Sequence, residues 1–460
     1  MADYAELRDL HLKAIRAFAP EAVSRLAWSR ERVREEQVQR LRKVVAHAQQ
    51  FSPYYREKLE GVDAATLTLE DLPSLPVLTK ADVMENWDRL VTDPRLRLAD
   101  VTAHLARLKA GAETNPYYLE KYYASATGGS SGKRGLFLWD WETFVVTANI
   151  TGRMEAQADA MEPPPGPRRT AVICAGALVH ASHLLFPVSL DPLRETRIFP
   201  AGLAIPALVD QLNAWQPDRI VGYASIVQEL CAEALDGRLQ VRLNRISTNS
   251  EPLLAEARAM ALKAWGINIH DTWGSVEIGV AASEGSSFTG LSLAEDFLIF
   301  EAVDGQNRPT TDPEQVERML VTKLFGSVMP MIRYEMTDAL ILDDTPNPDA
   351  PGCRRIRGIK GRSDAWFVYA GNIRIHPMIF RDGLGQEAHI SEYQVRQTAE
   401  GAQILAITHG LLDVPALTQT LQQALAKAGW PGAKLTVEVV PELPRHAETN
   451  KLVRFVPLPR

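Results

Sequence analysis

The first part of the chain carries a helical pattern of apolar positions. Over residues 21–60, apolar side chains such as Leu41 and Val45 recur at steps of three and four, and Arg, Glu and Gln fill the positions between them. This spacing places the apolar side chains on one face of a helix. Pro53 ends the pattern, and the sequence predicts a helical entry segment within residues 1–80.

The middle of the chain alternates between apolar runs and helical patterns. Alternation of this length predicts α/β layering around parallel strands. Two further strands have no helix between them, so an antiparallel barrel or sheet should follow the parallel part. Strands are expected at residues 170–176, 218–223, 245–248, 267–271, 297–302 and 318–324, and helices at residues 141–161, 226–234 and 253–265.

The C-terminal part shows the same alternation on a smaller scale. Expected strands at residues 403–408 and 434–440 flank a helical pattern at residues 414–428. We therefore expect a multi-domain α/β protein. Its large domain would span residues 1–363, and a small, mobile α+β lid domain would span residues 364–460.

Composition limits the partners and the location of the protein. The 460 residues are 46% hydrophobic and 23% charged, and the formal net charge of −7 gives no general attraction to nucleic acid or to an anionic membrane. The chain has no apolar run long enough for a membrane span, and its N-terminus lacks the charged-then-apolar order of a signal peptide. Cys174, Cys231 and Cys353 lie far apart, so we expect neither disulfides nor a cysteine zinc site, and a cytoplasmic protein.

One stretch has the composition of an anion-binding loop. Residues 125–135 contain four glycines, four hydroxyl side chains and the cations Lys133 and Arg134. Glycines let backbone N–H groups approach an anion, hydroxyls add donors and the cations add charge, which together suit a polyphosphate. The spacing is neither that of a Walker A loop nor that of a Rossmann fingerprint. The alternative is an ordinary Gly/Ser surface turn, but the aromatic run before the loop and the strand expected after it favour a binding loop.

Two other polar segments follow expected strands. Residues 270–277 place Trp273 and Glu277 directly after a strand, where ligands of α/β sheets bind. The aromatic ring can stack on a purine, and the carboxylate can hold Mg²⁺ against phosphates. The alternative is a plain turn with a solvated Glu277. Glu251 and Pro252 are compatible either with a binding segment or with a simple helix start.

Three more candidates lie towards the C-terminus. Asp338 suits a ribose diol, Arg362 offers a guanidinium to a phosphate beside a candidate hinge, and Lys451 stands alone in a polar loop. A lysine near a chain end is usually solvated, which is the alternative for Lys451. With the three earlier features, these residues complete one ordered set of motifs.

That order resembles the acyl-adenylate-forming superfamily, which includes acyl-CoA synthetases, nonribosomal adenylation domains and luciferase. Three stretches are similar to its phenylacetate–CoA ligase branch: Ser-Pro-Tyr-Tyr-Arg at residues 52–56, the Leu-Pro to Lys-Ala-Asp stretch at residues 72–82, and Met-Ile-Arg-Tyr at residues 331–334. The resemblance runs from about Arg30 to the C-terminus, which is nearly the whole chain.

The resemblance implies a role for each matching position. Lys451 would bridge the α-phosphate and the substrate carboxylate, Asp364 would be the pivot of the small domain, and Gly371 would leave room for the pantetheine arm of coenzyme A. The residues implied to bind ATP and Mg²⁺ are Thr127, Gly128, Ser130, Ser131, Gly132 and Lys133 for the triphosphate, Glu251, Pro252, Trp273 and Asp271 for the adenine, Asp338 for the ribose, Arg362 for a phosphate, and Glu277 for the metal ion.

The acid itself should bind between residues 175–186, residues 223–225 and the loop of Trp273. Its candidate lining suits a planar or aromatic acid. Core packing is the alternative for Phe186 and Tyr223. The candidate residues are His180, His183, Phe186, Tyr223, Ser225 and Gly274.

The sequence departs from the superfamily pattern at several positions. Val276 replaces the hydroxyl residue that usually precedes the glutamate, which leaves one hydrogen bond to a phosphate without its usual donor. Trp273 takes the usual tyrosine position, and Asn450 replaces the glycine before the lysine. The changes other than Val276 keep the chemistry and suggest a specialised member of the group.

We therefore expect a ligase that uses ATP and Mg²⁺ to convert a carboxylic acid into an acyl-AMP and then transfers the acyl group to coenzyme A. Alternative enzymes would keep the adenylation but use an amine, a carrier-protein thiol, or a hydroxyl that receives AMP. The non-enzymatic alternative is a nucleotide-binding protein, and the presence of Lys451, Asp338 and Glu277 argues against it. The family likeness and the amphipathic entry helices suggest a homodimer.

Overall fold

A computed structural model of the chain describes most of its residues and divides it into two compact units. The first unit comprises residues 1–336 and 341–358, and the second comprises residues 337–340 and 359–460. The described residues are 4–126, 135–163, 168–176, 178–312, 314–336, 338–362, 367–375, 379–380, 384, 387, 389–428, 430–446 and 450–458. No helix among them is both long and apolar enough to cross a membrane.

The entry segment is helical, as the apolar pattern predicts. Ser29 begins α2 by accepting a hydrogen bond from the backbone N–H of Arg32, and Ser52 begins α3 in the same way, with Pro53 in its first turn. The first helix, α1, lies within the predicted entry segment of residues 1–80, before most of the apolar pattern of residues 21–60. The helices before the first strand are α1 (Tyr4–Ser24), α2 (Arg30–Phe51), α3 (Pro53–Lys58), α4 (Lys80–Glu85), α5 (Trp87–Leu90) and α6 (Leu98–Lys109).

A small antiparallel sheet holds the segment on each side of the Gly-rich stretch. Its strands are β1 (Tyr117–Tyr118), β2 (Tyr122–Ala126) and β3 (Leu136–Trp139), in that order. The aromatic run forms the first two strands and the predicted strand forms the third. Every residue of β2 and β3 is buried, so the two ends of the Gly-rich stretch are anchored in the protein interior.

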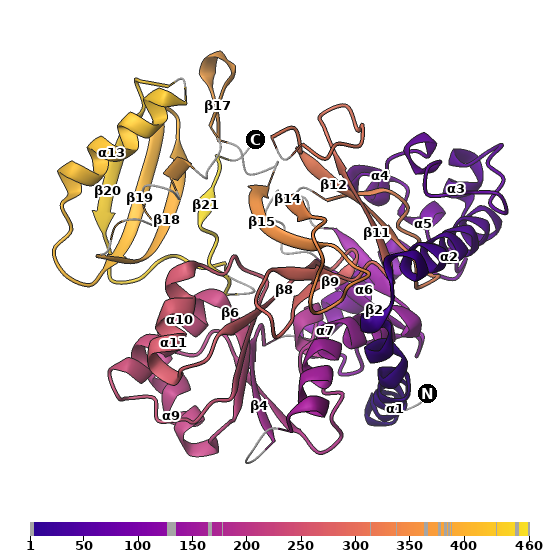
Figure 1. The fold of residues 1–460 in the computed structure, drawn as a ribbon, viewed down its shortest axis with the longest axis horizontal. Helices are drawn as coiled ribbons and strands as arrows, with labels where there is room; N and C mark the ends of the chain where they lie inside the picture. Colours follow the sequence, from indigo (N-terminus) through magenta and orange to yellow (C-terminus); the bar gives the residue numbers. More distant parts are fainter. Residues whose placement is uncertain are drawn as a thin grey trace. The chain divides into compact units, whose positions relative to one another are not determined.

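A nine-stranded sheet lies mostly in the first unit (Figure 1), and only residues 338–340 and 359–362 of its strands belong to the second. Its order is β14-β15-β10-β9-β8-β7-β6-β4-β5, and the five strands from β8 to β5 are parallel. The predicted α/β alternation is therefore confirmed. These strands are β4 (Arg169–Cys174), β5 (Glu195–Pro200), β6 (Arg219–Tyr223), β7 (Arg245–Asn249), β8 (Ile269–Ser275), β9 (Gly279–Glu284), β10 (Leu291–Leu293), β14 (Asp338–Asp343) and β15 (Arg355–Arg362).

Helices cover both faces of the parallel strands. Helices α9, α10 and α11 pack on one face over a core of apolar side chains, and α7 runs along the other (Figure 1). Helix α7 spans the predicted residues 141–161 and begins where Asp140 accepts a hydrogen bond from Thr143. The helices are α7 (Trp141–Met161), α8 (Ala181–Leu185), α9 (Ile205–Trp215), α10 (Ala224–Leu235) and α11 (Ala255–Trp265).

The sheet changes direction after β8, which the sequence pattern did not predict. Strand β9 returns antiparallel to β8, and β10 returns antiparallel to β9. The two strands that were expected without an intervening helix pair antiparallel and add a third, which gives the sheet β11-β12-β13. These strands are β11 (Leu298–Val303), β12 (Arg318–Lys323) and β13 (Tyr334–Met336).

The second unit has its own sheet and core. The sheet order is β20-β19-β18-β21, and α13 buries Leu417, Leu421 and Leu425, which lie four residues apart on one helix face. The longest strand, β18, was not predicted. The elements are β16 (Phe367–Tyr369), β17 (Ile373–Ile375), β18 (Ile390–Thr398), β19 (Gly401–Thr408), α13 (Val414–Lys427), β20 (Lys434–Val439) and β21 (Phe455–Val456).

Candidate functional site

The strands beside the Gly-rich stretch contact two other predicted segments. The indole N–H of Trp139 at the end of β3 donates to the carbonyl of Val276, 2.8 Å away. From β2, the hydroxyl of Tyr123 donates to the carbonyl of Leu178 (2.8 Å), and that of Ser125 donates to the carbonyl of Val179 (3.3 Å). The two strands that flank the Gly-rich stretch therefore contact the turn after β8 and the segment predicted to bind the acid.

The predicted triphosphate residues themselves cannot be placed. Thr127, Gly128, Ser130, Ser131, Gly132 and Lys133 lie outside the described residues, and so does Asp364, the predicted pivot.

The turn after β8 is shaped by close backbone contacts. A Cβ atom on Gly274 would lie 2.3 Å from the carbonyl oxygen of Gly279, and one on Gly279 would lie 2.5 Å from the hydroxyl of Thr147 in α7. Gly279 also has a φ of +81°, which favours glycine. Both glycines are thus required by packing against β9 and α7, and the turn presents Glu277 half-buried at its tip.

Two adenine-site candidates have defined partners. The backbone N–H of Ser225, at the start of α10, donates to the carboxylate of Glu251 (2.9 Å). Helix α11 begins only at Ala255, so the interpretation of Glu251 and Pro252 as a helix start is wrong. Trp273 is buried, with its ring 6.4 Å from that of Phe300.

Asp271 lies in β8 among polar neighbours. Its carboxylate accepts hydrogen bonds from the Thr248 hydroxyl (2.8 Å) and the Thr272 backbone N–H (3.0 Å). Burial raises the pKa of Asp271 to about 7, although the hydrogen bond from Thr248 acts in the opposite direction. At neutral pH this carboxyl group is therefore poised between its charged and neutral forms.

Two predicted acid-pocket residues bind the backbone of one residue, Ala175. The backbone N–H of Ala175 donates to the Tyr223 hydroxyl (3.1 Å), and the carbonyl of Ala175 accepts from Nδ1 of His183 (3.1 Å). Burial lowers the pKa of His183, so the ring is neutral at physiological pH. Tyr223 belongs to the buried core of the parallel sheet, as its packing alternative predicts, and His180 is also buried.

A cavity of about 550 Å³ lies between the sheet face and helices α1 and α7. It brings together Phe186 and Asp271, which the motifs assigned to the acid and to the adenine. It also contains arginines that the motifs did not mark, among them Arg194 and Arg245. These arginines precede or begin strands, and a lone arginine at a strand start carries no recognisable signal in the sequence.

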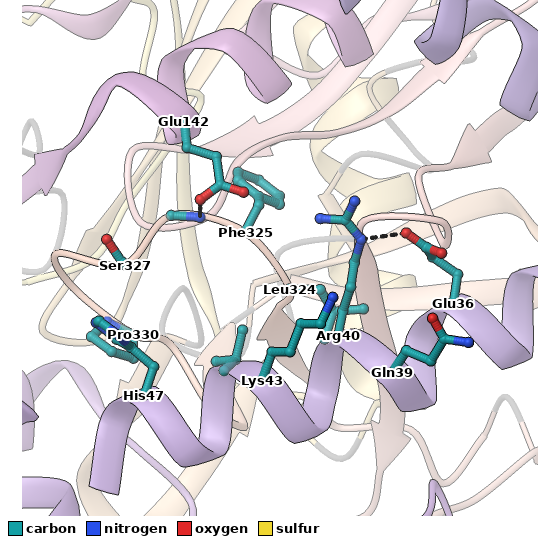
Figure 2. Close-up of a pocket in the computed structure, with 12 residues that line it drawn as sticks. Glu36, Gln39, Arg40, Lys43, His47, Glu142, Leu324, Phe325, Ser327 and Pro330 are labelled. Carbon is teal, nitrogen blue, oxygen red and sulfur yellow. Dashed lines mark hydrogen bonds and ion pairs between the residues drawn. The ribbon is translucent and has the colours of Figure 1, made fainter. Parts of the chain in front are cut away.

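A second cavity, of about 390 Å³, contains none of the predicted site residues. It lies between α2 and residues 324–330, and Figure 2 shows Lys43 and Arg40 projecting from α2 towards Glu142. Arg40 is paired with Glu36 (2.6 Å), and Glu142 accepts a hydrogen bond from the backbone N–H of Gly326 (3.2 Å). Much of the charge that lines this second cavity is therefore already paired within the protein.

The remaining predicted residues belong to the second unit. Asp338 begins β14, Arg362 ends β15, and the carbonyl of Lys451 accepts a hydrogen bond from the backbone N–H of His446 (2.9 Å). Gly371 has a φ of +75°, and no atom lies within 4 Å of a Cβ added there. Among the residues that the structure describes, no three His, Cys, Asp or Glu side chains cluster as a metal site.

The chain is similar to several known ligases. It is 26% identical over 390 residues to the phenylacetate–coenzyme A ligase of Pseudomonas putida, covering 80% of this chain and 79% of that protein. The crystal structure of 2-hydroxyisobutyryl-CoA ligase in the postadenylation state with 2-HIB-AMP matches with a TM-score of 0.69 at 21% identity, over 94% of this chain and 90% of that one.

Amide bond synthetase McbA from Marinactinospora thermotolerans matches with a TM-score of 0.51 at 12% identity, over 73% of this chain and 68% of that one. No family model matches the sequence. The chain thus has the fold of the acyl-CoA ligases of the adenylate-forming superfamily, and its sequence is similar to phenylacetate–coenzyme A ligases.

Proposed function

We propose that the protein is an ATP-dependent acid–coenzyme A ligase that forms an acyl-AMP and then a thioester. The observation that carries the proposal is the convergence around β2 and β3. Trp139 binds the turn that holds Glu277, and Tyr123 and Ser125 bind the segment that precedes His183. These contacts of β2 and β3 with two other predicted segments support the proposal.

Two chemical steps would use this place in turn. In the first, a carboxylate oxygen of the acid attacks the α-phosphorus of ATP, and pyrophosphate leaves. In the second, the thiol of coenzyme A loses its proton and attacks the acyl carbon, and AMP leaves with the former carboxylate oxygen. A carboxylate is a poor electrophile, so adenylation supplies the leaving group that the second step needs.

Each assigned residue has a physical task in the first step. Backbone N–H groups and hydroxyls of residues 127–133 would hold the triphosphate, and Lys451 would stabilise the charge that builds on the transferring group. Glu251 and Trp273 would hold the adenine, Asp338 the ribose and Arg362 a phosphate. These assignments rest on the motif matches.

Glu277 is the residue proposed to hold Mg²⁺. A single carboxylate fits this ion, which commonly binds one or two carboxylates together with substrate phosphates. When bound, the ion would neutralise charge on the phosphates.

We further propose that the acid is aryl or planar, that the second unit acts as a lid pivoting at Asp364, and that the protein is a cytoplasmic homodimer.

An amine is the second candidate for the acyl acceptor. The likeness in fold to an amide bond synthetase supports it, because an acyl-AMP reacts with an amine as readily as with a thiol. Adenylation would be the same in both cases, so the two candidates differ only in the second step.

Pyrophosphate release tests the proposal and separates the candidates. A panel of aryl and alkyl acids would be assayed with ATP and Mg²⁺, with and without coenzyme A. We expect release to require an acid and the acyl-AMP to be consumed when coenzyme A is added. Consumption by an amine but not by coenzyme A would favour the second candidate. No binding of any adenine nucleotide would refute both.

A further inference from the structure

The 550 Å³ cavity combines predicted site residues with buried positive charge. Phe186 and Asp271 line it, and so do Arg194 and Arg245. Arg245 begins β7 and Thr248, which also lines the cavity, lies three residues further along the strand. At about 3.3 Å per residue, the cavity follows β7 for roughly 10 Å. It is long enough for an extended or aromatic acid with a functional group at each end.

The guanidinium of Arg194 is only partly engaged by the protein. Its side chain is 1% exposed, and Nη1 donates to the carboxylate of Asp218 (3.1 Å). Its Nε and Nη2 atoms are buried and make no hydrogen bond to any described residue. Leaving donors of a buried cation unpaired is costly, so these atoms are well suited to receive an acceptor from a ligand.

Arg245 has a similar deficit. Its side chain is 12% exposed, its closest carboxylate is Glu155 at 3.5 Å, and its Nε also lacks a hydrogen bond to the described residues. The neighbouring carboxylate of Asp159 is already held by Arg219 through two bonds of 2.8 and 2.9 Å. Among the described residues, Nε of Arg245 is thus held only by its 3.5 Å ion pair with Glu155, and Nε and Nη2 of Arg194 have no hydrogen-bond acceptor.

The arginines also act on one another. Burial lowers the pKa of Arg245 to about 10, and the charge of Arg194 adds to the effect, while Asp159 opposes it. The pKa of Arg219 falls to about 9 through burial and the charge of Arg245. An anion placed between Arg194 and Arg245 would relieve both the desolvation and the repulsion.

We propose that the acid activated by this enzyme carries a second anionic group, which Arg194 and Arg245 bind within the cavity. The inference rests on the proposed function, because it takes the cavity to hold the acid. The second group is an oxyanion, and a planar one such as a carboxylate matches the fork of a guanidinium. Glu155 and Asp159 also line the cavity, and their carboxylates repel an anion more than they repel a neutral apolar group. The second anionic group must therefore contact the arginines.

Matched acids test the proposal on the unmodified protein. Phenylacetate would be compared with 4-carboxyphenylacetate, and octanoate with suberate, by pyrophosphate release. We expect the acid with the second carboxylate to be favoured in kcat/KM by about 10-fold or more, as charge-assisted hydrogen bonds to a buried guanidinium allow. A phosphonate in place of the second carboxylate shows whether any oxyanion suffices.

Variants locate the preference. Arg245→Met should reduce the ratio between diacid and monoacid to near one, and Arg194→Lys should reduce it in part. Arg169→Met is the matched control, because Arg169 also begins a strand but has a half-exposed side chain outside the cavity. The ratio is a property of the folded fraction alone, so partial unfolding of a variant does not imitate the result.

Direct binding separates failure of this inference from failure of the proposed function. Calorimetry without ATP should show suberate or 4-carboxyphenylacetate binding to the wild type and not to Arg245→Met. Diacid binding without pyrophosphate release would refute the ligase and keep the anion site. Equal turnover of monoacids and diacids would refute the anion site and keep the ligase. If no diacid binds while a monoacid releases pyrophosphate, the anion site is overturned and the ligase stands. If no acid of either kind releases pyrophosphate and no adenine nucleotide binds, the ligase is overturned as well.

Discussion

Arg333 and Glu301 form a buried, two-pronged ion pair, with hydrogen bonds of 3.0 Å from Nε and from Nη2 to the two carboxylate oxygens. The Nη1 atom of Arg333 also donates to the carbonyl of Leu75 (2.5 Å) and to that of Pro73 (3.1 Å). The Leu-Pro stretch and the Met-Ile-Arg-Tyr stretch, which the sequence analysis recognised separately, are therefore two halves of one contact.

Arg333→Met should destabilise the first unit. It leaves Glu301 buried without a partner, which typically costs about 3–5 kcal/mol. The free energy of unfolding in urea would measure the loss. Glu301→Gln should cost less, and the double variant should be less destabilised than the sum of the two, because they share one interaction. If Arg333→Met lowered the free energy of unfolding by less than about 0.5 kcal/mol, the ion pair would not be important for stability.

Asp271→Asn should change how stability depends on pH. Burial raises the pKa of Asp271 to about 7, above its unfolded value of about 3.9. Between these values the folded state holds more protons than the unfolded state, so this group makes stability fall as pH rises from about 4 to about 7, with no further change above that window. Asparagine removes the titration, and the difference in unfolding free energy between the two proteins should follow this window. If the unfolding free energies of the two proteins changed with pH in parallel, the pKa of Asp271 would not be raised by folding.

Gly274→Ala should destabilise the turn after β8. The added Cβ would lie 2.3 Å from a backbone oxygen, and such overpacking costs about 1–3 kcal/mol. Gly202→Ala is the control, because no atom lies within 4 Å of a Cβ there. Thermal unfolding of both variants would measure the difference. Equal midpoints would mean that the turn adjusts without cost.

Lys451→Ala should slow acyl-AMP formation by about 10²-fold or more, because it removes a charge that stabilises the transition state. The variant should still convert a synthetic acyl-AMP to the thioester at a near wild-type rate. Single-turnover assays of each half-reaction would separate the two steps. Lys427→Ala, an exposed lysine in the last turn of α13, is the control.

The reverse pattern is expected at the proposed pivot. Asp364→Pro should preserve adenylation and block thioester formation by restricting the lid. Normal adenylation by Lys451→Ala would show that this lysine is only a solvated residue.

Gly371→Trp should block thioester formation while sparing adenylation, if the thiol approaches at this position. The φ of +75° makes any L-residue strained there, so bulk and strain must be separated. Gly371→Asn provides the control, because asparagine tolerates this conformation better than other residues. Inhibition of the second step by tryptophan but not by asparagine would support a steric block, and equal inhibition by both would attribute the effect to backbone strain.

Local patterns were enough for the central α/β elements of the fold. Helix α7 has the expected bounds of residues 141–161, and the strands β4, β6 and β7 fall within one or two residues of their expected positions. Apolar periodicity and proline positions act over a few residues, so they can be read without the rest of the chain. Among the strands that the pattern missed are β9, β10 and β18, which lie inside their sheets and pair antiparallel with a neighbouring strand, so their stability depends on that neighbour.

The residues of the candidate site also divide into those that the sequence marked and those that only the folded chain revealed. Gly-rich composition and motif order were sufficient to mark the Gly-rich stretch, Glu251, Trp273 and Glu277, because close approach to phosphate and stacking on a base demand particular residue types. Other relationships needed the folded chain. Trp139 meets Val276 across 137 positions, Arg333 joins Glu301 to the Leu-Pro stretch, and Arg194 and Arg245 face one cavity from separate strands. Such contacts arise when the sheet aligns distant segments, and a buried arginine without a full set of partners has no signature until its neighbours are in place.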